Sequence, residues 1–328
     1  MANLTTKATI SRVISMYLDT VYLARSEATY RTYKNAMKKF GEVLTVSKLN
    51  PDETDISELT EDAIAWLASE LKSYSPATEQ CYLTAATGLY EYIAGEEIKD
   101  INLPRVRLLI KQRARRPGIR LPQFPRHQIE DMIDFALALN QQPVEDERQR
   151  LINYRDRAFL ITLADTGLRV HEACGLRRGD IDWNESRAIV IGKGNKEAVV
   201  RFSKRSLQAL KDYLGLRAKL DGASGRSLGS MAIFARHDKA VGDAIKAIST
   251  TTGRKIVAER VAQALGEEAV GTITPHSFRH YFVTTVLQAS GNLKLAQELA
   301  RHKNIAVTQR YSHLSDDELD KEYLDIFG

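Results

Sequence analysis

Residues 187–202 read RAIVIGKGNKEAVVRF, and this stretch interrupts an otherwise helical sequence. Two runs rich in β-branched residues, 187–191 and 198–202, flank the glycine-bearing segment Gly192-Lys193-Gly194-Asn195-Lys196. Such residues favour strands, and a short connection with glycine between two of these runs is typical of a β-hairpin. The sequence therefore predicts a small antiparallel sheet within a mainly helical chain.

Helical periodicity dominates on both sides of this hairpin. Before it, apolar residues are spaced for one helix face in residues 10–23, 30–40, 64–67 and 82–93. Ser26 and the pair Ser75-Pro76 stand where helix caps and first-turn residues are expected. After the hairpin, helical spacing returns at Ser206 and continues almost to the end. The expected fold class is mainly α with a small antiparallel β-sheet (α+β).

A seam divides the chain, whose 328 residues suit two domains. Residues 104–125 include Pro104, Pro117, Pro122 and Pro125, and the helical pattern breaks in their middle. We place the domain boundary near residue 117. This gives a helical N-terminal domain with a basic linker at residues 1–116 and a second domain at residues 117–328.

Composition restricts the class of protein. No run of about 18 consecutive apolar residues occurs, so we expect no membrane span. The N-terminal residues lack the pattern of a secretion signal. Cys81 and Cys174 are far apart and suggest neither a disulfide framework nor a zinc ribbon. We therefore expect a cytoplasmic protein without a metal site.

Positive charge is concentrated in the seam, although the net charge of the chain is only +5. Between Asp100 and Glu130 there is no acidic residue. This segment is either a solvated linker or a strap along DNA phosphates, where each neutralised phosphate releases counterions. The candidate DNA-binding residues are Arg105, Arg107, Lys111, Arg113, Arg115, Arg116 and Arg120.

Four stretches of the second domain carry side chains suited to chemistry. They are TGLRVHE (166–172), GKGNK (192–196), PHSFRH (275–280), and Arg301-His302 followed nine positions later by Tyr311. Arginines can donate paired hydrogen bonds to one phosphate, and histidines and a lysine can exchange protons around it. A tyrosine can serve as a covalent nucleophile. Together they suit transesterification at a phosphodiester without a metal ion.

The order and spacing of these four motifs resemble the tyrosine recombinase (phage integrase) family, especially its XerC/XerD-like members. The resemblance implies an N-terminal helical core-binding (SAM-like) domain and a C-terminal catalytic domain. It also implies a site-specific recombinase that cleaves and rejoins DNA through a 3′-phosphotyrosyl intermediate. Such an enzyme needs no metal, cofactor or ATP, and serves integration, excision or dimer resolution.

The resemblance also implies a role for each motif residue. Arg169 and Arg279 would clamp the scissile phosphate and stabilise the pentacoordinate transition state. Lys193 would protonate the departing 5′-oxygen, with Lys196 as the alternative general acid. Tyr311 would attack the phosphorus.

The remaining motif residues would support that reaction. His276 and His302 would complete the pocket, and one of them would help to take the tyrosine proton. Glu172 would orient the first arginine, and His280 would be structural support. Arg301 departs from the family pattern, which usually has glycine before the second histidine. A larger side chain there could crowd the pocket or add a phosphate contact.

The implied partners are double-stranded DNA recombination sites. By resemblance, a homotetramer would form on paired sites, with the C-terminal tail at residues 312–328 exchanged between neighbouring protomers. The protein would be cytoplasmic and nucleoid-associated. The target DNA sequence, and the choice between dimer resolution, integration and inversion, stay open.

Three other kinds of protein fit the sequence less well. For a metalloprotease, Gly175 stands where a His-Glu-x-x-His motif would need its second histidine, and the pair His276 and His280 lacks a third ligand. A type IB topoisomerase is disfavoured because the motif sequences are XerC/XerD-like and the N-terminal domain is small and helical. A non-catalytic DNA-binding protein is disfavoured because Tyr311 and both arginines are present. Only a nucleophilic tyrosine would leave protein attached to DNA in EDTA.

Overall fold

A computed structural model describes residues 8–115, 125–144, 146–192, 196–238 and 245–302. The chain divides into two compact units, Met1–Ile119 and Arg120–Gly328. Within the described residues helices predominate, and three strands form one antiparallel sheet in the order β1-β2-β3. The predicted fold class, mainly α with a small antiparallel sheet, is confirmed. Among the described residues, no helix is both long and apolar enough to cross a membrane.

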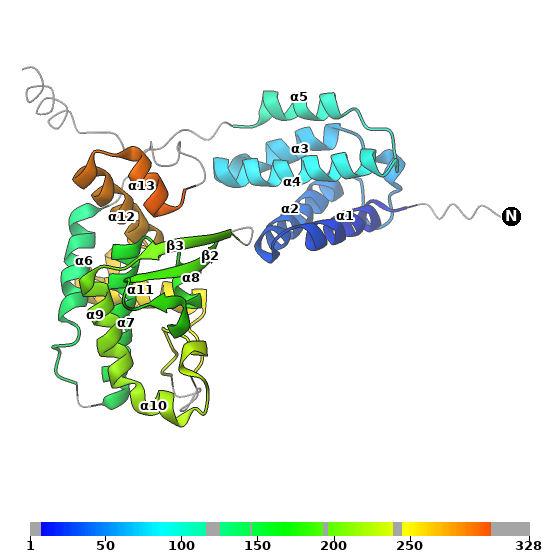
Figure 1. Ribbon diagram of the computed structural model, residues 1–328. Coiled ribbons are helices and arrows are strands. Elements are labelled where there is room, and N and C mark those ends of the chain that lie inside the picture. The colour runs from blue at the N-terminus through cyan, green and yellow to red at the C-terminus, as the bar shows by residue number, and fades with distance from the viewer. Residues whose placement is uncertain (1–7, 116–124, 145, 193–195, 239–244, 303–328) are drawn as a thin grey trace, which may run out of the picture. The chain divides into compact units, whose positions relative to one another are not determined.

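The N-terminal unit is a helical bundle (Figure 1). Side chains of Thr9, Ser26 and Ser75 accept hydrogen bonds from backbone N–H groups three residues ahead and so cap its longest helices. Their apolar faces meet in one buried core around Phe40 and Tyr90. The elements are α1 (Ile10–Ala24), α2 (Glu27–Val46), a 3₁₀ turn (Ile56–Glu58), α3 (Asp62–Glu70), a 3₁₀ turn (Leu71–Ser73), α4 (Pro76–Gly95) and α5 (Leu103–Arg113).

Helix α5 lies in the basic segment that is predicted to be a linker. The Asn102 side chain caps it by accepting from the backbone N–H of Arg105 at 3.0 Å. Pro104 occupies the first turn, where its missing N–H costs nothing. Val106 and Leu109 are buried in the core of the bundle. The first half of the basic segment is therefore a helix held to the bundle by two apolar side chains. Two apolar residues among several arginines are too few to predict a buried helix face from the sequence.

The second unit surrounds a buried central helix, α7. This helix packs against α6, α9 and α12, and its side chains from Ala158 to Ala164 are buried. The elements are α6 (Arg126–Ala138), α7 (Glu147–Thr166), α8 (Val170–Gly175), a 3₁₀ turn (Arg178–Asp180), β1 (Ile181–Asp182), β2 (Arg187–Gly192), β3 (Lys196–Arg201), α9 (Lys204–Leu216), α10 (Ala218–Ala223), a 3₁₀ turn (Leu228–Ser230), α11 (Thr250–Leu265), a 3₁₀ turn (Glu267–Ala269), α12 (Pro275–Ser290) and α13 (Leu293–Ala300).

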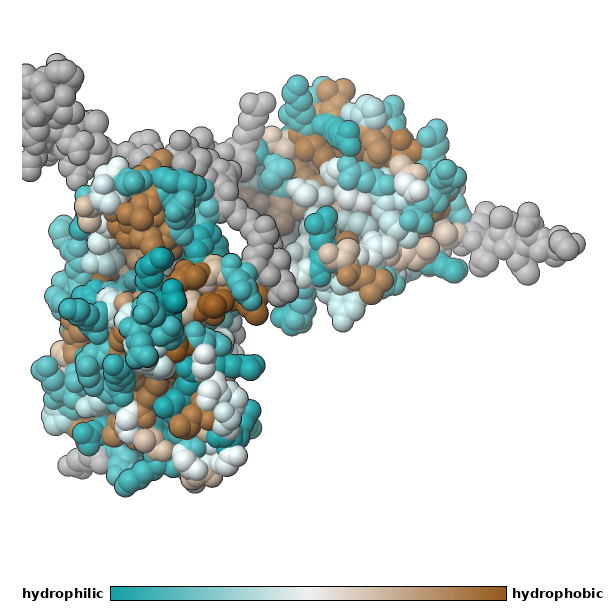
Figure 2. Space-filling model, viewed as in Figure 1, coloured by the Kyte–Doolittle hydropathy of each residue, from teal (hydrophilic) through white to brown (hydrophobic). Residues whose placement is uncertain are grey.

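The predicted hairpin is present as β2 and β3. Its register pairs Arg187 with Arg201 and Gly192 with Lys196. One face carries Ala188, Val190 and Val200 into the core. Alternate side chains point the other way, and Figure 2 shows hydrophobic surface over this hairpin. The exposed apolar residues are Ile189, Ile191 and Val199.

A buried hydrogen-bond network joins α9 to the loop that follows α10. The Tyr213 hydroxyl accepts from Arg217 Nη1 at 3.1 Å and from the Ala235 N–H at 3.2 Å. Its own proton is then donated to His237 Nε2, 2.8 Å away. Burial, followed by the positive charges of Arg155 and Arg217, lowers the pKa of His237 to about 3. This histidine is therefore neutral in the folded protein at neutral pH.

His237 makes folding pH-dependent. Its pKa is about 3 in the folded state and near 6.5 when the chain is unfolded, so protons bind preferentially to the unfolded state. The stability that His237 contributes is complete above pH 6.5 and is lost progressively as the pH falls from 6.5 towards 3. The slope approaches about 1.4 kcal/mol per pH unit.

Denaturant unfolding between pH 7 and 4 checks this prediction. A His237→Gln variant keeps an acceptor for the tyrosine hydroxyl but does not titrate. We expect the free energy of unfolding of the wild type to fall more steeply with acid than that of the variant. Parallel curves for the two proteins would contradict the assignment.

Candidate active site

The site begins at the junction of α7 and α8. Gly167 ends α7 in the left-handed conformation, with φ of 58°. A β-carbon at this position would collide with the Phe282 ring of α12, so a glycine is required on two grounds. The buried Leu168 then anchors the turn, and Arg169 becomes the N-cap residue of α8. The glycine and leucine of the TGLR motif thus place the first arginine.

Glu172 fixes the position of Arg169. Its Oε2 accepts from the Arg169 backbone N–H at 2.8 Å, and its Oε1 accepts from Arg169 Nη1 at 3.0 Å. The glutamate side chain is 1% exposed, whereas the arginine side chain is 40% exposed. Burial tends to raise the pKa of Glu172, but the charges of Arg301 and Arg169 hold it below the usual value. The carboxylate is therefore ionised and leaves much of the Arg169 guanidinium accessible.

Helix α12 carries the PHSFRH motif into the same region. The backbone N–H of Thr274 donates to Ser277 Oγ at 3.0 Å and helps to fix the start of the helix. Arg279, one turn into the helix, is only 3% exposed. Its two terminal nitrogens donate to the carbonyl oxygens of Gly167 and Ala300. The second arginine thereby joins the ends of α7 and α13.

Histidines surround these arginines. His276 and His280 lie one turn apart, with ring centroids 4.3 Å apart in an edge-to-face arrangement. Residue His302 follows the end of α13, where its N–H donates to the Gln297 carbonyl at 3.0 Å. Burial first, and nearby positive charge second, lowers the pKa of His276 and brings the pKa of His302 to about 4. Burial, together with His276 and Arg279, also lowers the pKa of His280 to about 4.

The electrostatics of the cluster therefore favour neutral imidazoles. At pH 7 each of these histidines can accept a proton, and none adds a full positive charge. The permanent charge of the site comes from its arginines, because a guanidinium stays protonated in proteins. Such a site attracts an anion and can also move a proton.

A cavity of about 650 Å³ opens beside these groups. Its lining includes Arg169, His276 and Arg279, so three of the predicted residues face one space. His171 and Arg254 also line it and were not predicted. The histidine lies within the TGLRVHE motif and could have been noted there. Arg254 belongs to α11, far from any motif, and no pattern in the sequence marks it.

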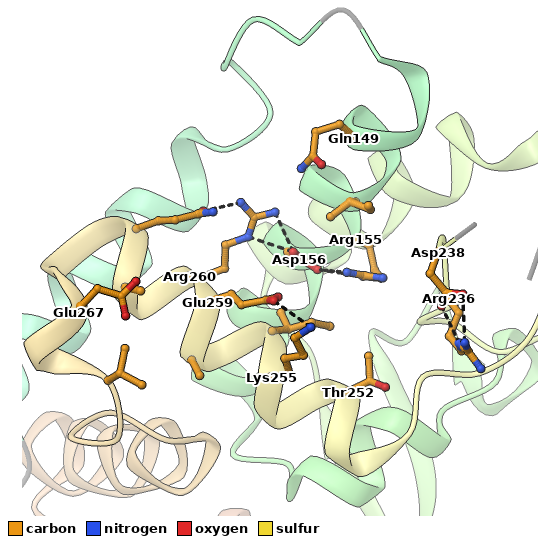
Figure 3. Close-up of a pocket in the computed structure, with 16 residues that line it drawn as sticks. Gln149, Arg155, Asp156, Arg236, Asp238, Thr252, Lys255, Glu259, Arg260 and Glu267 are labelled. Carbon is orange, nitrogen blue, oxygen red and sulfur yellow. Dashed lines mark hydrogen bonds and ion pairs between the residues drawn. The ribbon is translucent and has the colours of Figure 1, made fainter. Parts of the chain in front are cut away.

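A second cavity, of about 830 Å³, lies between α7 and α11 (Figure 3). Asp156 accepts from Arg155 at 2.7 and 2.8 Å and from Arg260 at 2.7 and 2.9 Å. Lys255 pairs with Glu259 at 3.3 Å along the rim. Because these charges are largely matched within the cavity wall, we assign this network to stability rather than to anion binding.

Two of the predicted catalytic residues, Lys193 and Tyr311, lie outside the described residues. The register of the hairpin places Lys196, the alternative general acid, at the start of β3. Arg116 and Arg120 also lie outside the described residues. Within those residues, no group of three or more His, Cys, Asp or Glu side chains is arranged to hold a metal ion.

The basic residues of α5 differ in how they are engaged. Arg105 pairs with Asp62 at 2.8 Å, and Arg107 pairs with Glu91 at 3.1 Å. Lys111 and Arg113 are exposed and, within the described part of the chain, have no ion-pair partner.

Arg115 is held inside its own unit. It donates from Nε to Glu79 Oε2 at 2.6 Å and from its backbone N–H to Glu79 Oε1 at 2.9 Å. Its Nη2 donates to the carbonyls of Leu71 and Tyr74. Since Glu79 is fully buried, this arginine fastens the chain that leaves α5 to the helical bundle.

The sequence of the chain resembles those of known proteins. Residues 124–318 match the family model described as "Phage integrase family". The chain is 30% identical over 306 residues to Tyrosine recombinase XerC of Thermodesulfovibrio yellowstonii, covering 92% of this chain and 91% of that protein. It is also 24% identical to Tyrosine recombinase XerC of Proteus mirabilis, over 96% of this chain and 93% of that protein.

Solved structures share the fold. The post-cleavage complex of XerH site-specific recombinase bound to palindromic difH substrate matches with a TM-score of 0.67 and 18% identity, over 96% of this chain and 84% of that one. The Tn1549 transposon integrase in complex with transposon right end DNA matches with a TM-score of 0.63 and 18% identity, over 96% and 99% of the two chains.

Proposed function

Because the chain belongs to the phage integrase family and is a tyrosine recombinase, a site-specific DNA strand transferase, we propose that Tyr311 is its nucleophile and that Arg169 and Arg279 hold the scissile phosphate. One observation carries the assignment of the arginines. Buried Arg279 donates to the last turns of two helices, and this brings it to the same cavity as Arg169 and His276.

The proposed reaction balances without an external energy source. The Tyr311 oxygen forms a bond to phosphorus, and the bond from phosphorus to the 5′-oxygen breaks. A neutral histidine, His276 or His302, takes the tyrosine proton; their lowered pKa values keep both imidazoles unprotonated before this step. Lys193 donates a proton to the departing 5′-oxygen. The 3′-phosphotyrosyl bond conserves the energy of the broken diester, so the 5′-hydroxyl of another strand can reverse the chemistry.

The arginines supply what the transition state needs. Negative charge grows on the nonbridging oxygens as phosphorus becomes pentacoordinate, and fixed donors aimed at those oxygens stabilise it without reorganisation. Each guanidinium can donate two parallel hydrogen bonds to a phosphate, which an ammonium group cannot reproduce. Glu172 keeps Arg169 in one orientation for this purpose.

The N-terminal unit is proposed to act as the core-binding domain, with its basic helix against DNA. Lys111 and Arg113 are the strongest candidates for phosphate contacts, because they are exposed and have no ion-pair partner in the described part of the chain. Arg105 and Arg107 would have to exchange an acidic partner for a phosphate. Arg115 is better placed to anchor the following segment, which includes Arg116 and Arg120.

We further propose that the chain acts as a homotetramer on paired DNA sites, with residues 312–328 exchanged between protomers. Two of the matched relatives, XerH and the Tn1549 integrase, are described as bound to DNA. The acidic and apolar composition of residues 312–328 suits a segment that packs on a neighbouring subunit. A recombinase acts where its DNA is, so we propose the cytoplasm and its nucleoid as the location.

Covalent capture in EDTA tests the nucleophile. The wild-type protein is incubated with a library of nicked duplexes of random sequence, denatured, and separated from unbound DNA. We expect adducts whose DNA sequences converge on one site and whose digestion releases a phosphotyrosyl peptide containing Tyr311. An adduct that maps to another residue would overturn the proposed site, and an adduct that forms only with added metal would overturn the metal-free chemistry.

A further inference from the structure

We propose that Arg301, which stands where the family usually has glycine, is a positioning residue that holds Arg169 and Arg279 around one phosphate and adds a fixed positive charge beside them. This inference rests on the proposed function of those two arginines. It does not require that Arg301 itself touches DNA.

The contacts of Arg301 link the two supports of the phosphate-binding arginines. Its Nη2 donates to Glu172 Oε2 at 3.1 Å, and the same carboxylate holds Arg169. Nη2 also lies 3.4 Å from the Gly167 carbonyl oxygen, which accepts from Arg279 as well. One guanidinium is thus shared between the acceptor that orients Arg169 and an acceptor that orients Arg279. A shift of Arg301 would therefore disturb the supports of both Arg169 and Arg279.

The position itself is unfavourable for an arginine. Arg301 has φ of 58°, a left-handed conformation that suits glycine far better than a long side chain. Its side chain is only 10% exposed. Within the described residues, its Nε and Nη1 are buried and have no hydrogen-bond partner. Unsatisfied buried donors cost free energy, as does backbone strain, and such costs concentrate at functional sites.

Charge explains what this arrangement provides. Arg169 and Arg301 both contact the carboxylate of Glu172, and Arg279 shares the Gly167 carbonyl with Arg301, so these four groups carry a net charge of +2. A bound phosphodiester reduces this to +1, and the additional negative charge of the pentacoordinate transition state brings it to zero. Without Arg301, the diester alone would neutralise the cluster. We therefore expect Arg301 to favour the transition state more than DNA binding.

The test measures the rate of adduct formation and the DNA affinity separately, on the nicked site recovered by covalent capture. The variants are Arg301→Gly, which suits the left-handed backbone, and Arg301→Lys, which keeps the charge. Lys294→Met is the matched control, because it removes an exposed positive charge from the preceding helix, α13. Thermal unfolding confirms that each variant is folded.

We expect Arg301→Gly to slow adduct formation by about 10- to 100-fold, since misplacement of a catalytic group by about 1 Å can cost about 100-fold. DNA affinity should change by less than about threefold, because the loss falls on the transition state. Arg301→Lys should recover part of the rate, and Lys294→Met should match the wild type. An Arg301→Gly rate equal to the wild type would overturn the proposal, as would a loss confined to DNA affinity.

A second substrate separates charge from mere packing. Replacing one nonbridging oxygen of the scissile phosphate by a methyl group gives a neutral methylphosphonate, which needs less positive charge. The defect of Arg301→Gly should shrink on this substrate by about fivefold or more. An equal defect on both substrates would overturn the electrostatic role. If peptide mapping places the adduct away from Tyr311, the proposed nucleophile is wrong. The ratio of the Arg301→Gly and wild-type rates still tests the role of Arg301 separately.

Discussion

Replacing Tyr311 by phenylalanine is expected to abolish the covalent protein–DNA adduct, while DNA affinity stays within about twofold of the wild type. The substitution removes one oxygen atom and keeps the aromatic ring. Without that oxygen no bond to phosphorus can form, whereas the arginines that attract the phosphate are unchanged. The measurement is adduct formation on nicked duplex DNA in EDTA, with affinity determined in parallel by mobility shift.

A matched control removes a hydroxyl elsewhere in the same unit. Tyr281→Phe changes a partly buried tyrosine of α12 that packs against the hydrophobic core. We expect this variant to form adducts at the wild-type rate. An adduct that persists in Tyr311→Phe would place the nucleophile on another residue. Loss of adducts in both variants would show that the assay reports general damage to the unit.

The second large effect concerns Arg279. Replacing it by lysine should lower the rate of adduct formation by about 100- to 1000-fold, the range found when a fixed donor to a transition-state oxyanion is removed. A single ammonium group cannot donate to the carbonyls of both Gly167 and Ala300 and also present a planar pair of donors to phosphate. The rate should fall far more than the affinity for DNA.

Arg260→Lys is the control for this substitution. Arg260 is also a buried arginine of the second unit, 5% exposed, and pairs with Asp156 in the cavity of Figure 3. Its replacement should reduce the free energy of unfolding but leave the adduct rate per folded molecule near that of the wild type. If Arg260→Lys slowed cleavage as much as Arg279→Lys, the loss could not be attributed to the phosphate site.

Much of the local structure could be predicted because it depends on neighbouring residues. Ser26 and Ser75 cap their helices through bonds to the backbone three residues ahead. The hairpin follows from β-branched residues around a glycine-bearing turn. The order of the catalytic motifs also lies in the sequence, and it identified the family that the comparisons confirm. The roles assigned to individual residues stay predictions.

Other features depended on partners far along the chain. Helix α5 was expected to be linker, because only the bundle core shows that Val106 and Leu109 are buried. The contacts of Arg115 also depend on a distant residue, because nothing near it in sequence reveals that Glu79 accepts its hydrogen bonds. The neutral state of His237 likewise depends on its burial and on the charges of Arg155 and Arg217.

The sequence by itself determined the secondary structure of most segments, the likeness to a family and the set of reactive side chains. The tertiary structure decided which of these side chains meet, because hydrogen bonds such as that from Arg279 to Gly167 join residues more than a hundred positions apart. The tertiary structure also decided which groups Arg301 contacts. Whether that side chain crowds the site or serves it depends on Glu172, and the charge and burial of a distant carboxylate cannot be inferred from the residues next to Arg301.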